Sequence, residues 1–356
     1  MEKELINSQV SLTYAKAAKM KVKNLCCPTS YREDLLEDLP TEILEKDYGC
    51  GDPSRFVKKG DVVLDLGSGV GKMCYMIAKI VGSDGKVTGV DMNDEMLEVA
   101  RKYQDELNNR ENVAPVDFVK ARIQDMKVDV EKLETQMRTM EFNGLDDLQN
   151  LESYTTSLKK QPVIPNNSYD LVISNCVLNL VQEEERRDLI NEIYRVLKPG
   201  GRFAISDIVS SHIVPNDMKT RDNLWGDCIS GSFQEEKFSW LFAKQGFVHI
   251  KYESWAADPW KIIDNIEFRS VTIFGYKPVN TTCDDCCYQV IYKGPFSELM
   301  DDADHRYPRG KRVNLCQETF EHLKFFAPND FVFISQEEGV MQIEKMNEED
   351  DCCSTC

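Results

Sequence analysis

Cysteines occur at three places in the sequence where they could bind a ligand together. Cys176 ends the buried run "DLVISNC", Cys50 lies in "DYGCGDP", and Cys228 lies in "LWGDCISGSF". Thiolates are soft ligands that select soft ions, so three thiols from separate segments could converge on one small soft centre. Taken singly, Cys176 or Cys228 is better explained as a buried thiol that packs like a small hydrophobic residue.

A glycine-rich loop offers a second kind of chemistry. In "LDLGSGVG", Asp65 precedes Gly67, Gly69 and Gly71, and glycines let a chain turn sharply and approach a ligand closely. The spacing is G-x-G-x-G, whereas a pyrophosphate-binding loop has G-x-G-x-x-G. An acid two residues before the first glycine suits a ligand with a cation and an amino group. Asp91, in "VTGVDM", could accept both hydroxyl hydrogens of an adenosine ribose; the alternative is a turn and a capping acid that bind nothing.

The elements that must position these residues follow from the apolar pattern. Short apolar runs alternate with amphipathic stretches between Val62 and Ile273, as in parallel βαβ units. We expect strands at 61–69, 85–92, 113–121, 168–181, 201–209, 247–255 and 268–278. We expect helices at 71–82, at 93–107 with Asn93 as N-cap, and from 183 to a stop at Lys198 and Pro199. The last two strands lack a helix of ordinary length between them, which predicts an antiparallel hairpin at the sheet edge.

The loop and the strand pattern resemble the S-adenosylmethionine-dependent methyltransferases of the seven-stranded class. The stretch "YRVLKPGGRFAISD" strengthens the likeness, because such a turn usually announces the fifth strand of that family. The resemblance implies an α/β fold with a Rossmann-like, seven-stranded sheet. It also implies S-adenosylmethionine as cofactor, with the three glycines along its methionine end, Asp91 at the ribose, and Ile123 and Gln124 beside the adenine.

The residue types expected near the fourth strand suggest which kind of atom accepts the methyl group. The chain has only four histidines (212, 249, 305 and 322), and none lies beside that strand in the sequence. Oxygen and nitrogen acceptors usually need a general base. Trivalent arsenic bound by three sulfurs keeps a lone pair that could itself attack a methyl group. The three cysteines and the shortage of bases together favour a metalloid site.

The sequence segments around the cysteines point to one family within the methyltransferases. The segments "YGCG", "SNCVLNLV" and "LWGDC", and later "CYQVIYKG", "ELMDDADHRYPRGKRV" and "CCSTC", look like matching segments of the arsenite methyltransferases, over nearly the whole chain. The resemblance implies Cys50, Cys176 and Cys228 as catalytic ligands of the substrate arsenic, with the last two retained for methylated arsenicals. The residues expected to bind the cofactor are Tyr48, Asp65, Gly67, Gly69, Gly71, Asp91, Met92, Ile123, Gln124 and Asn175.

The family also has an N-terminal cysteine that forms a disulfide with the "YGCG" cysteine during turnover. Cys26 or Cys27 would take that role, and the "N-x-C" context favours Cys26. Exchange with an external thiol, glutathione or thioredoxin, would restore both thiols. Tyr48 would lie near the sulfonium, where an aromatic face favours positive charge. Arsenite and methylated arsenicals would arrive as glutathione conjugates.

The domain organisation follows from the same segments. We expect an N-terminal segment with cysteines at 1–60, an S-adenosylmethionine-binding domain at 61–209, a substrate-side and sheet-completing region at 210–278, and a small C-terminal α+β domain with a Cys-rich tail at 279–356. The polar stretch 126–162 interrupts the βαβ pattern and predicts a surface insertion of one or two helices.

Composition limits the partners and the compartment. The 356-residue chain is 42% hydrophobic and 29% charged, with a net charge of −18. That charge argues against nucleic acid or an anionic membrane as partner, because both attract clustered Lys and Arg. The N-terminus does not resemble a signal peptide, and no apolar run of transmembrane length occurs. We therefore expect a cytoplasmic protein, and a monomer because no exposed apolar seam is evident.

Other readings stay open at this point. The thirteen cysteines are odd in number, so a fixed disulfide framework is not expected. The C-x-x-C pairs in "CDDCC" and "CCSTC" could bind zinc, capture arsenic, shuttle redox equivalents or have no structural role. A methyltransferase for a small amine, phospholipid head or sterol would keep its activity without Cys176 and Cys228. A thiol-rich metalloid- or zinc-binding protein on the same scaffold would fail to bind S-adenosylmethionine.

Overall fold

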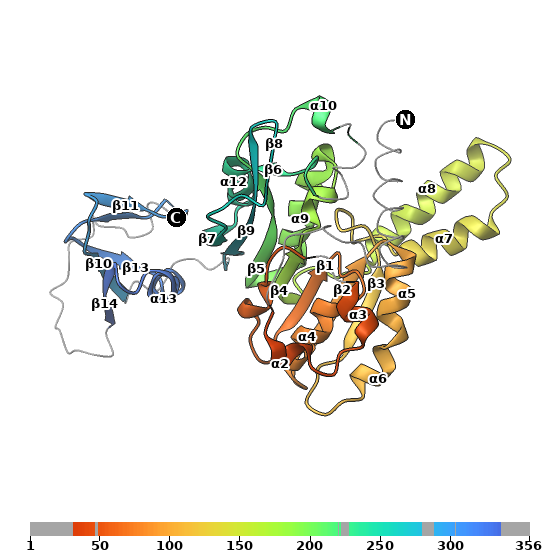
Figure 1. The fold of residues 1–356 in the computed structure, drawn as a ribbon, viewed down its shortest axis with the longest axis horizontal. Coiled ribbons are helices and arrows are strands. Elements are labelled where there is room, and N and C mark those ends of the chain that lie inside the picture. The colour runs from red at the N-terminus through yellow and green to blue at the C-terminus, as the bar shows by residue number, and fades with distance from the viewer. Residues whose placement is uncertain are drawn as a thin grey trace.

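A mixed β-sheet runs through the centre of the molecule (Figure 1). This computed structural model describes residues 31–46, 49–219, 221, 228–279, 288–302 and 304–335. The main path of the sheet has seven strands in the order β3-β2-β1-β4-β5-β9-β7. Two short strands, β6 and β8, pair with β5 and β9 off that path. The path agrees with the expected seven-stranded class.

The main-sheet strands are β1 (Val62–Leu66), β2 (Lys86–Asp91), β3 (Val116–Lys120), β4 (Tyr169–Asn175), β5 (Leu197–Ser210), β6 (Phe233–Gln234), β7 (Val248–Trp255), β8 (Lys261–Ile263) and β9 (Ile266–Tyr276). The first five pair in parallel along the path, with β1 between β2 and β4. Strands β5 and β9 are antiparallel, as are β9 and β7. The predicted antiparallel pair at the sheet edge is therefore confirmed.

Helices cover both faces of the sheet. The elements before and among the strands are α2 (Glu33–Leu36), α3 (Thr41–Glu45), η1 (Pro53–Phe56), α4 (Lys72–Val81), α5 (Asp94–Lys102), α6 (Gln104–Asn108), α9 (Arg186–Val196), α10 (Asn216–Lys219) and α12 (Glu235–Gln245). In one buried cluster, the helices α2, α3, α4 and α5 pack on one face of the sheet. In a second cluster, α9 and α12 pack on the other face. The core thus has three layers, with alternate strand residues entering opposite clusters.

Two predicted helices differ from the observed ones. The expected helix 93–107 begins at its predicted N-cap, Asn93, whose side chain accepts the Met96 N–H, but it divides at Tyr103 into α5 and α6. The expected helix to Lys198 ends instead at Val196. Leu197 already pairs with Tyr169 in the sheet, so strand pairing ends α9 before the Pro-Gly stop.

The stretch 126–162 contains two helices, α7 (Val130–Thr139) and α8 (Leu145–Lys160), which project as a hairpin from the body (Figure 1). Ion pairs connect α7 to the body: Glu134 pairs with Lys120 of β3, and Glu131 pairs with Arg101 of α5. None of the residues of these two fully described helices is buried. The hairpin therefore adds little to the core.

The C-terminal region forms a separate small sheet, β13-β10-β14, with one helix. Its elements are β10 (Tyr288–Tyr292), β11 (Glu298–Met300), β12 (Arg306–Pro308), β13 (Arg312–Leu315), α13 (Gln317–Phe326) and β14 (Phe331–Ser335). These strands and the helix agree with the small C-terminal α+β fold expected there. Within the described parts of the chain, no helix is both long and apolar enough to cross a membrane.

Candidate active site

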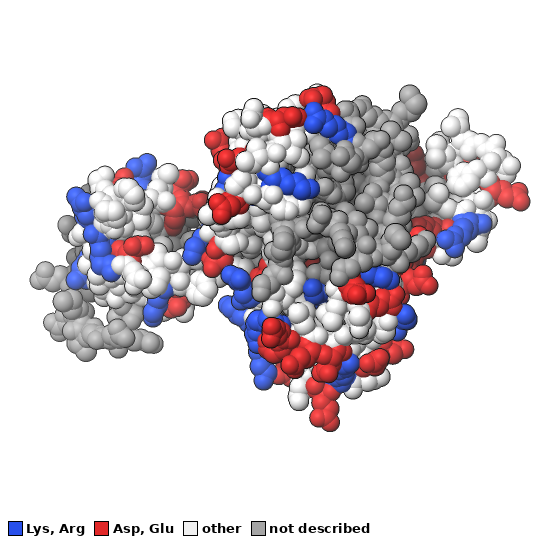
Figure 2. Space-filling view, viewed as in Figure 1, with Lys and Arg blue, Asp and Glu red and all other residues white. Residues whose placement is uncertain are grey.

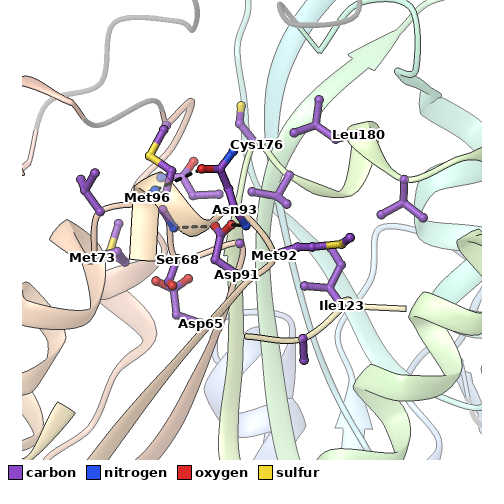
Figure 3. A pocket seen from close by; sticks show the side chains of 18 of the residues that line it. Asp65, Ser68, Met73, Asp91, Met92, Asn93, Met96, Ile123, Cys176 and Leu180 are labelled. Atoms are coloured by element: carbon purple, nitrogen blue, oxygen red, sulfur yellow. Dashed lines mark hydrogen bonds between the residues drawn. The ribbon is translucent and has the colours of Figure 1, made fainter. Parts of the chain in front are cut away.

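A cavity of about 400 Å³ opens where β1, β2 and β4 end (Figure 3). This position, at the carboxyl ends of parallel strands, is where open α/β sheets bind ligands, and the volume suits a small-molecule site. Eight of the ten residues predicted to bind cofactor line it: Asp65, Gly67, Gly69, Asp91, Met92, Ile123, Gln124 and Asn175. Tyr48, the ninth, lies outside the described residues.

Gly71, the tenth, is not among the described residues that line the cavity. It is the N-cap of α4, with a φ of +83° that favours glycine. A Cβ added there would stand 2.6 Å from the Phe118 ring. The turn into α4 and this packing explain the glycine, and its expected place along the methionine end of the cofactor stays a prediction.

Asp91 is partly buried and is held by fixed hydrogen bonds. One carboxylate oxygen accepts the Gly69 N–H at 2.8 Å, and the other accepts the Asn93 N–H at 2.8 Å. Burial raises the pKa of Asp91, while these backbone hydrogen bonds oppose that rise. The backbone thus holds the carboxylate at the cavity wall, with lone pairs remaining for a ligand's hydroxyl groups.

Two further polar groups of the cavity wall, Asp65 and Ser68, belong to the glycine-rich stretch itself. Asp65 is almost fully buried and accepts the Cys74 S–H at 3.2 Å. The Ser68 hydroxyl is buried and has no hydrogen-bond partner among the described residues, although Ser68 lines the cavity. A buried polar atom without a partner is costly, so a ligand that bonds to Ser68 would remove that cost. The sequence analysis did not single out Ser68.

The expected adenine end has its own polar cluster. The Gln124 amide donates to Glu185 at 3.0 Å, and Arg122 forms an ion pair with the same carboxylate at 2.9 Å. Ile123, between them in sequence, is buried and lines the cavity. An apolar surface flanked by amide and charged groups suits a flat polar ring.

Cys50, Cys176 and Cys228 lie together next to the cavity. All three are at least 95% buried and belong to one apolar cluster, which also contains Ile208 and Phe268. Cys176 lines the cavity itself, and its side chain stands at the end of β4 in Figure 3. The Cys228 thiol donates to the Cys176 carbonyl oxygen at 3.3 Å. The predicted convergence of the three cysteines is therefore present in the fold.

Hydrogen bonds from two strands hold the Cys50 loop. The Asn175 side-chain oxygen accepts the N–H groups of Cys50 and Gly51, at 2.8 and 3.1 Å. Ser270, on β9, donates to the Cys50 carbonyl oxygen at 2.5 Å. A Cβ at Gly51 would stand 2.4 Å from the Ser206 hydroxyl, so only glycine allows this approach. Asn175, predicted as a cofactor residue, thus also connects the cavity to the cysteine loop.

The cysteines are not all thiols in this structure. Cys50 and Cys176 form a disulfide with a Cα–Cα distance of 5.8 Å, a pairing that the sequence analysis did not predict. The expected partner of Cys50, Cys26, lies outside the described residues, as do Cys27 and the cysteines of "CDDCC" and "CCSTC". The Cys26–Cys50 pair therefore stays a prediction.

Asp207 is the acidic residue that sequence reasoning missed. A carboxylate oxygen of Asp207 and the sulfurs of Cys50 and Cys176 all lie within 4.8 Å of one another. Burial raises the pKa of Asp207 to about 7. The sequence analysis counted only histidines as bases beside the fourth strand and therefore missed this carboxyl group. The sequence does contain a sign of this residue, because "AISD" places an acid near the carboxyl end of the neighbouring strand.

Comparison with known proteins agrees with this geometry. A family model described as a methyltransferase domain matches residues 57–246, and one described as a domain of unknown function matches residues 280–355. The arsenite methyltransferase of Mus musculus is 32% identical, over 85% of this chain and 75% of that protein. The arsenite methyltransferase of Aquipseudomonas alcaligenes is 29% identical, over 87% of this chain and 84% of that protein.

A solved structure extends the similarity to the fold. The crystal structure of an arsenic(III) S-adenosylmethionine methyltransferase from Chlamydomonas reinhardtii superposes with a TM-score of 0.58 and 27% identity. The match covers 88% of this chain and 98% of that one. Sequence and fold thus agree over most of the length, and the chain belongs to the arsenite methyltransferase family.

Proposed function

We propose that this enzyme transfers methyl groups from S-adenosylmethionine to trivalent arsenic bound by Cys50, Cys176 and Cys228, giving mono- and dimethylated arsenicals. The observation that carries the proposal is the convergence of three cysteines from separate segments in one apolar cluster. One of them, Cys176, is also part of the cavity wall. Thiolates in apolar surroundings suit a soft, thiol-seeking centre better than an amine or a lipid head.

The cavity fits S-adenosylmethionine, which supplies an electrophilic methyl group when bound. Asp91 would hold the ribose hydroxyls, Asp65 the amino group of the methionine part, and Ile123 with Gln124 the adenine. The Ser68 hydroxyl, buried and without a described partner, would bond to the methionine part. The chain's main contribution is to hold the acceptor in line with the methyl group and to exclude water.

The transfer itself requires no protein base. Arsenic bound by three thiolates keeps a lone pair, which forms the new carbon–arsenic bond while the carbon–sulfur bond of the sulfonium breaks. The arsenic passes formally from the trivalent to the pentavalent state, and its return requires two electrons. Two thiolates release two electrons when they join as a disulfide. Cys50 and Cys176, which form such a bond here, are suited to supply them.

An external thiol would then restore the site. Cys26 could attack the Cys50 sulfur and release the Cys176 thiolate, which would produce the Cys26–Cys50 disulfide expected from the family. Glutathione or thioredoxin would reduce that disulfide by thiol exchange and glutathione would carry the arsenical substrates. A compartment that keeps thiols reduced, such as the cytoplasm, suits this cycle.

The decisive experiment follows labelled methyl from S-adenosylmethionine to arsenite with excess glutathione. The native enzyme should produce labelled mono- and dimethylarsenicals, and Cys176→Ser should lower the rate at least about 100-fold, because the acceptor loses a ligand. Cys316→Ser is the matched control: Cys316 is half-buried and lies just before α13. Its rate should stay within about twofold of native, as for most changes outside a site.

The other readings predict different results. If the native enzyme binds S-adenosylmethionine but methylates only amines or lipids, and does so equally as Cys176→Ser, the arsenic proposal fails. If it binds arsenicals but not the cofactor, it is a thiol-rich binding protein. Without any reductant, the proposal expects at most about one methyl group per enzyme molecule, because each turnover consumes one pair of thiols.

A further inference from the structure

We propose that Asn179 is a positioning residue that holds Cys228 against Cys176, so that the two sulfurs can share one methylated arsenical. The inference rests on the proposed function, because it takes these two cysteines as the ligands retained after the first methylation. Asn179 lies in η2 (Leu178–Leu180), three residues after Cys176. Its side chain is fully buried and does not line the cavity.

The Asn179 amide joins three segments of the chain. Its nitrogen donates to Asp207 and to the Ile208 carbonyl oxygen on β5, both at 2.7 Å, with a longer contact of 3.4 Å to the Cys228 carbonyl oxygen. Its oxygen accepts the Phe233 N–H at 3.2 Å. One side chain therefore contacts both ends of the segment 228–233 and fixes that segment to β5.

Neighbouring groups support this connection without duplicating it. The Asp207 carboxylate also accepts the backbone N–H of Asn179 at 3.2 Å and that of Ile208 at 2.8 Å, so the acceptor is held rigidly.

The Arg186 guanidinium donates to the carbonyl oxygens of Val181 and Gly231. Arg186 reaches the middle of the segment, whereas Asn179 reaches Cys228 itself.

The backbone of the two cysteines explains why such support is needed. Cys176 and Cys228 both have a φ of +60°, a left-handed conformation that is unfavourable for a residue other than glycine. Such conformations persist when surrounding contacts determine them. The hydrogen bonds of Asn179 begin within one turn of Cys176 and end at Cys228. They are suited to stabilise both strained residues in one arrangement.

Only an amide meets all these demands at once. The site needs donors for a carboxylate and a carbonyl oxygen and an acceptor for an N–H, which a short side chain provides only as Asn. Alanine would leave the Phe233 N–H and the Ile208 carbonyl oxygen without their partner. Serine keeps one donor and one acceptor but is too short to reach both β5 and the Cys228 segment.

The test compares native enzyme, Asn179→Ala, Asn179→Ser, Cys228→Ser and Ser174→Ala. Ser174→Ala is the matched control, because Ser174 is also fully buried, lies on β4 just before Cys176, and its hydroxyl donates to the Leu66 carbonyl oxygen at 3.0 Å. Two readouts are used below the unfolding temperature of every variant. One is KM and kcat with methylarsenite, beside KM for S-adenosylmethionine. The other is the yield of the peptide pair Cys176–Cys228 bridged by dibromobimane after reduction.

We expect Asn179→Ala and Asn179→Ser to raise KM for methylarsenite or lower kcat by roughly 10- to 100-fold, the effect of an ångström-scale misplacement. The bridged peptide should fall in parallel, while KM for S-adenosylmethionine should stay near native. Ser174→Ala should match native in both readouts. A purely structural role would lower the unfolding temperature of Asn179→Ala and Ser174→Ala alike and leave bridging intact.

Two results would overturn the inference in distinguishable ways. If Cys228→Ser lowers methylation of methylarsenite but Asn179→Ala does not, the thiol site stands and the positioning role fails. If Cys228→Ser itself methylates methylarsenite at the native rate, the proposed thiol site fails and the positioning role fails with it.

Discussion

At the scale of single residues, some site residues can be predicted from a sequence motif and others cannot. Asp65, Gly67, Gly69 and Asp91 occur in a motif placed between a strand and a helix, and such context makes a ligand site predictable. Asp207 has no motif: it is one acid inside the strand "GRFAISDIV". Its proximity to the cysteine sulfurs depends on which strands become neighbours, and that pairing is decided by the whole sheet.

Asp91 gives the most direct residue-scale prediction. Asp91→Asn keeps an oxygen that can accept the Gly69 N–H, so the glycine loop should stay in place. It loses the negative charge, and a hydrogen bond to a charged group contributes about 1.5–3 kcal/mol. The dissociation constant of S-adenosylmethionine should therefore rise at least about tenfold, as measured by titration calorimetry.

The matched control for that change is Asp117→Asn. Asp117 lies on the adjacent strand β3, is half-exposed and pairs with Lys86 at 2.7 Å, so its loss should leave cofactor affinity unchanged. Equal affinity of Asp91→Asn and native enzyme would contradict the assignment of Asp91 to the ribose.

At the scale of elements, the sequence predicted types and order better than ends. The βαβ pattern, the antiparallel edge pair and the Asn93 cap were predictable because apolar period and capping are local. The division of the helix at Tyr103 and the early end of α9 at Val196 were not. The second of these arises from pairing of Leu197 with Tyr169, a contact between residues 28 positions apart in the chain.

The disulfide and the left-handed cysteines were also beyond sequence reasoning. A bond between Cys50 and Cys176 requires two loops separated by 126 residues to meet. The family resemblance instead implied Cys26 as the disulfide partner of Cys50. Residue type does not predict a positive φ at Cys176 or Cys228, because cysteine has no preference for that region. Both features depend on contacts with Asn175, Asn179 and Ser270.

The α7–α8 hairpin leads to an element-scale prediction. A chain with 130–160 replaced by a short Gly-Ser linker should fold and bind S-adenosylmethionine with native affinity. None of the residues of α7 and α8 is buried, and none lines the cavity. The lost ion pairs with Arg101 and Asp125 are each worth about 1 kcal/mol or less near a surface. The buried Lys120 loses Glu134 but keeps its ion pair with Asp94.

Thermal unfolding and cofactor titration of that shortened chain provide the check. A fall in the unfolding temperature of more than about 10 °C, beyond what roughly 2 kcal/mol of lost ion pairs explains, would show that the hairpin is part of the core. A selective loss of affinity for S-adenosylmethionine would instead give it a role at the cavity.

At the scale of the whole molecule, charge and domain contact are the main features. Acidic and basic side chains are mixed over the face in Figure 2, with acids crowded over its lower part, in keeping with the net charge of −18. The small C-terminal sheet meets the main sheet through an aromatic cluster. The His322 ring of α13 stacks on Tyr276 of β9 at 4.1 Å and lies 4.5 Å from His249 of β7.

This contact should make stability depend on pH. Burial lowers the pKa of His322 to about 4, helped by the nearby His249 and Lys58, and burial also lowers the pKa of His249 against the pull of Asp301 and Asp302. Between the ordinary histidine pKa near 6.5 and about 4, the unfolded chain binds a proton that folded His322 does not. Stability should therefore be full above about pH 6.5 and fall as the pH drops toward 4.

Replacing His322 with a ring that cannot titrate isolates this effect. His322→Phe keeps an aromatic ring for Tyr276, so the loss of stability between pH 7 and pH 5 should shrink by an amount on the order of 1 kcal/mol, less than the full pKa shift because solvent partly screens the ring. His212→Asn, at an exposed histidine, should retain the native slope. If His322→Phe shows the native pH slope in thermal unfolding, the acid sensitivity comes from other groups, and the burial of His322 at this contact does not explain it.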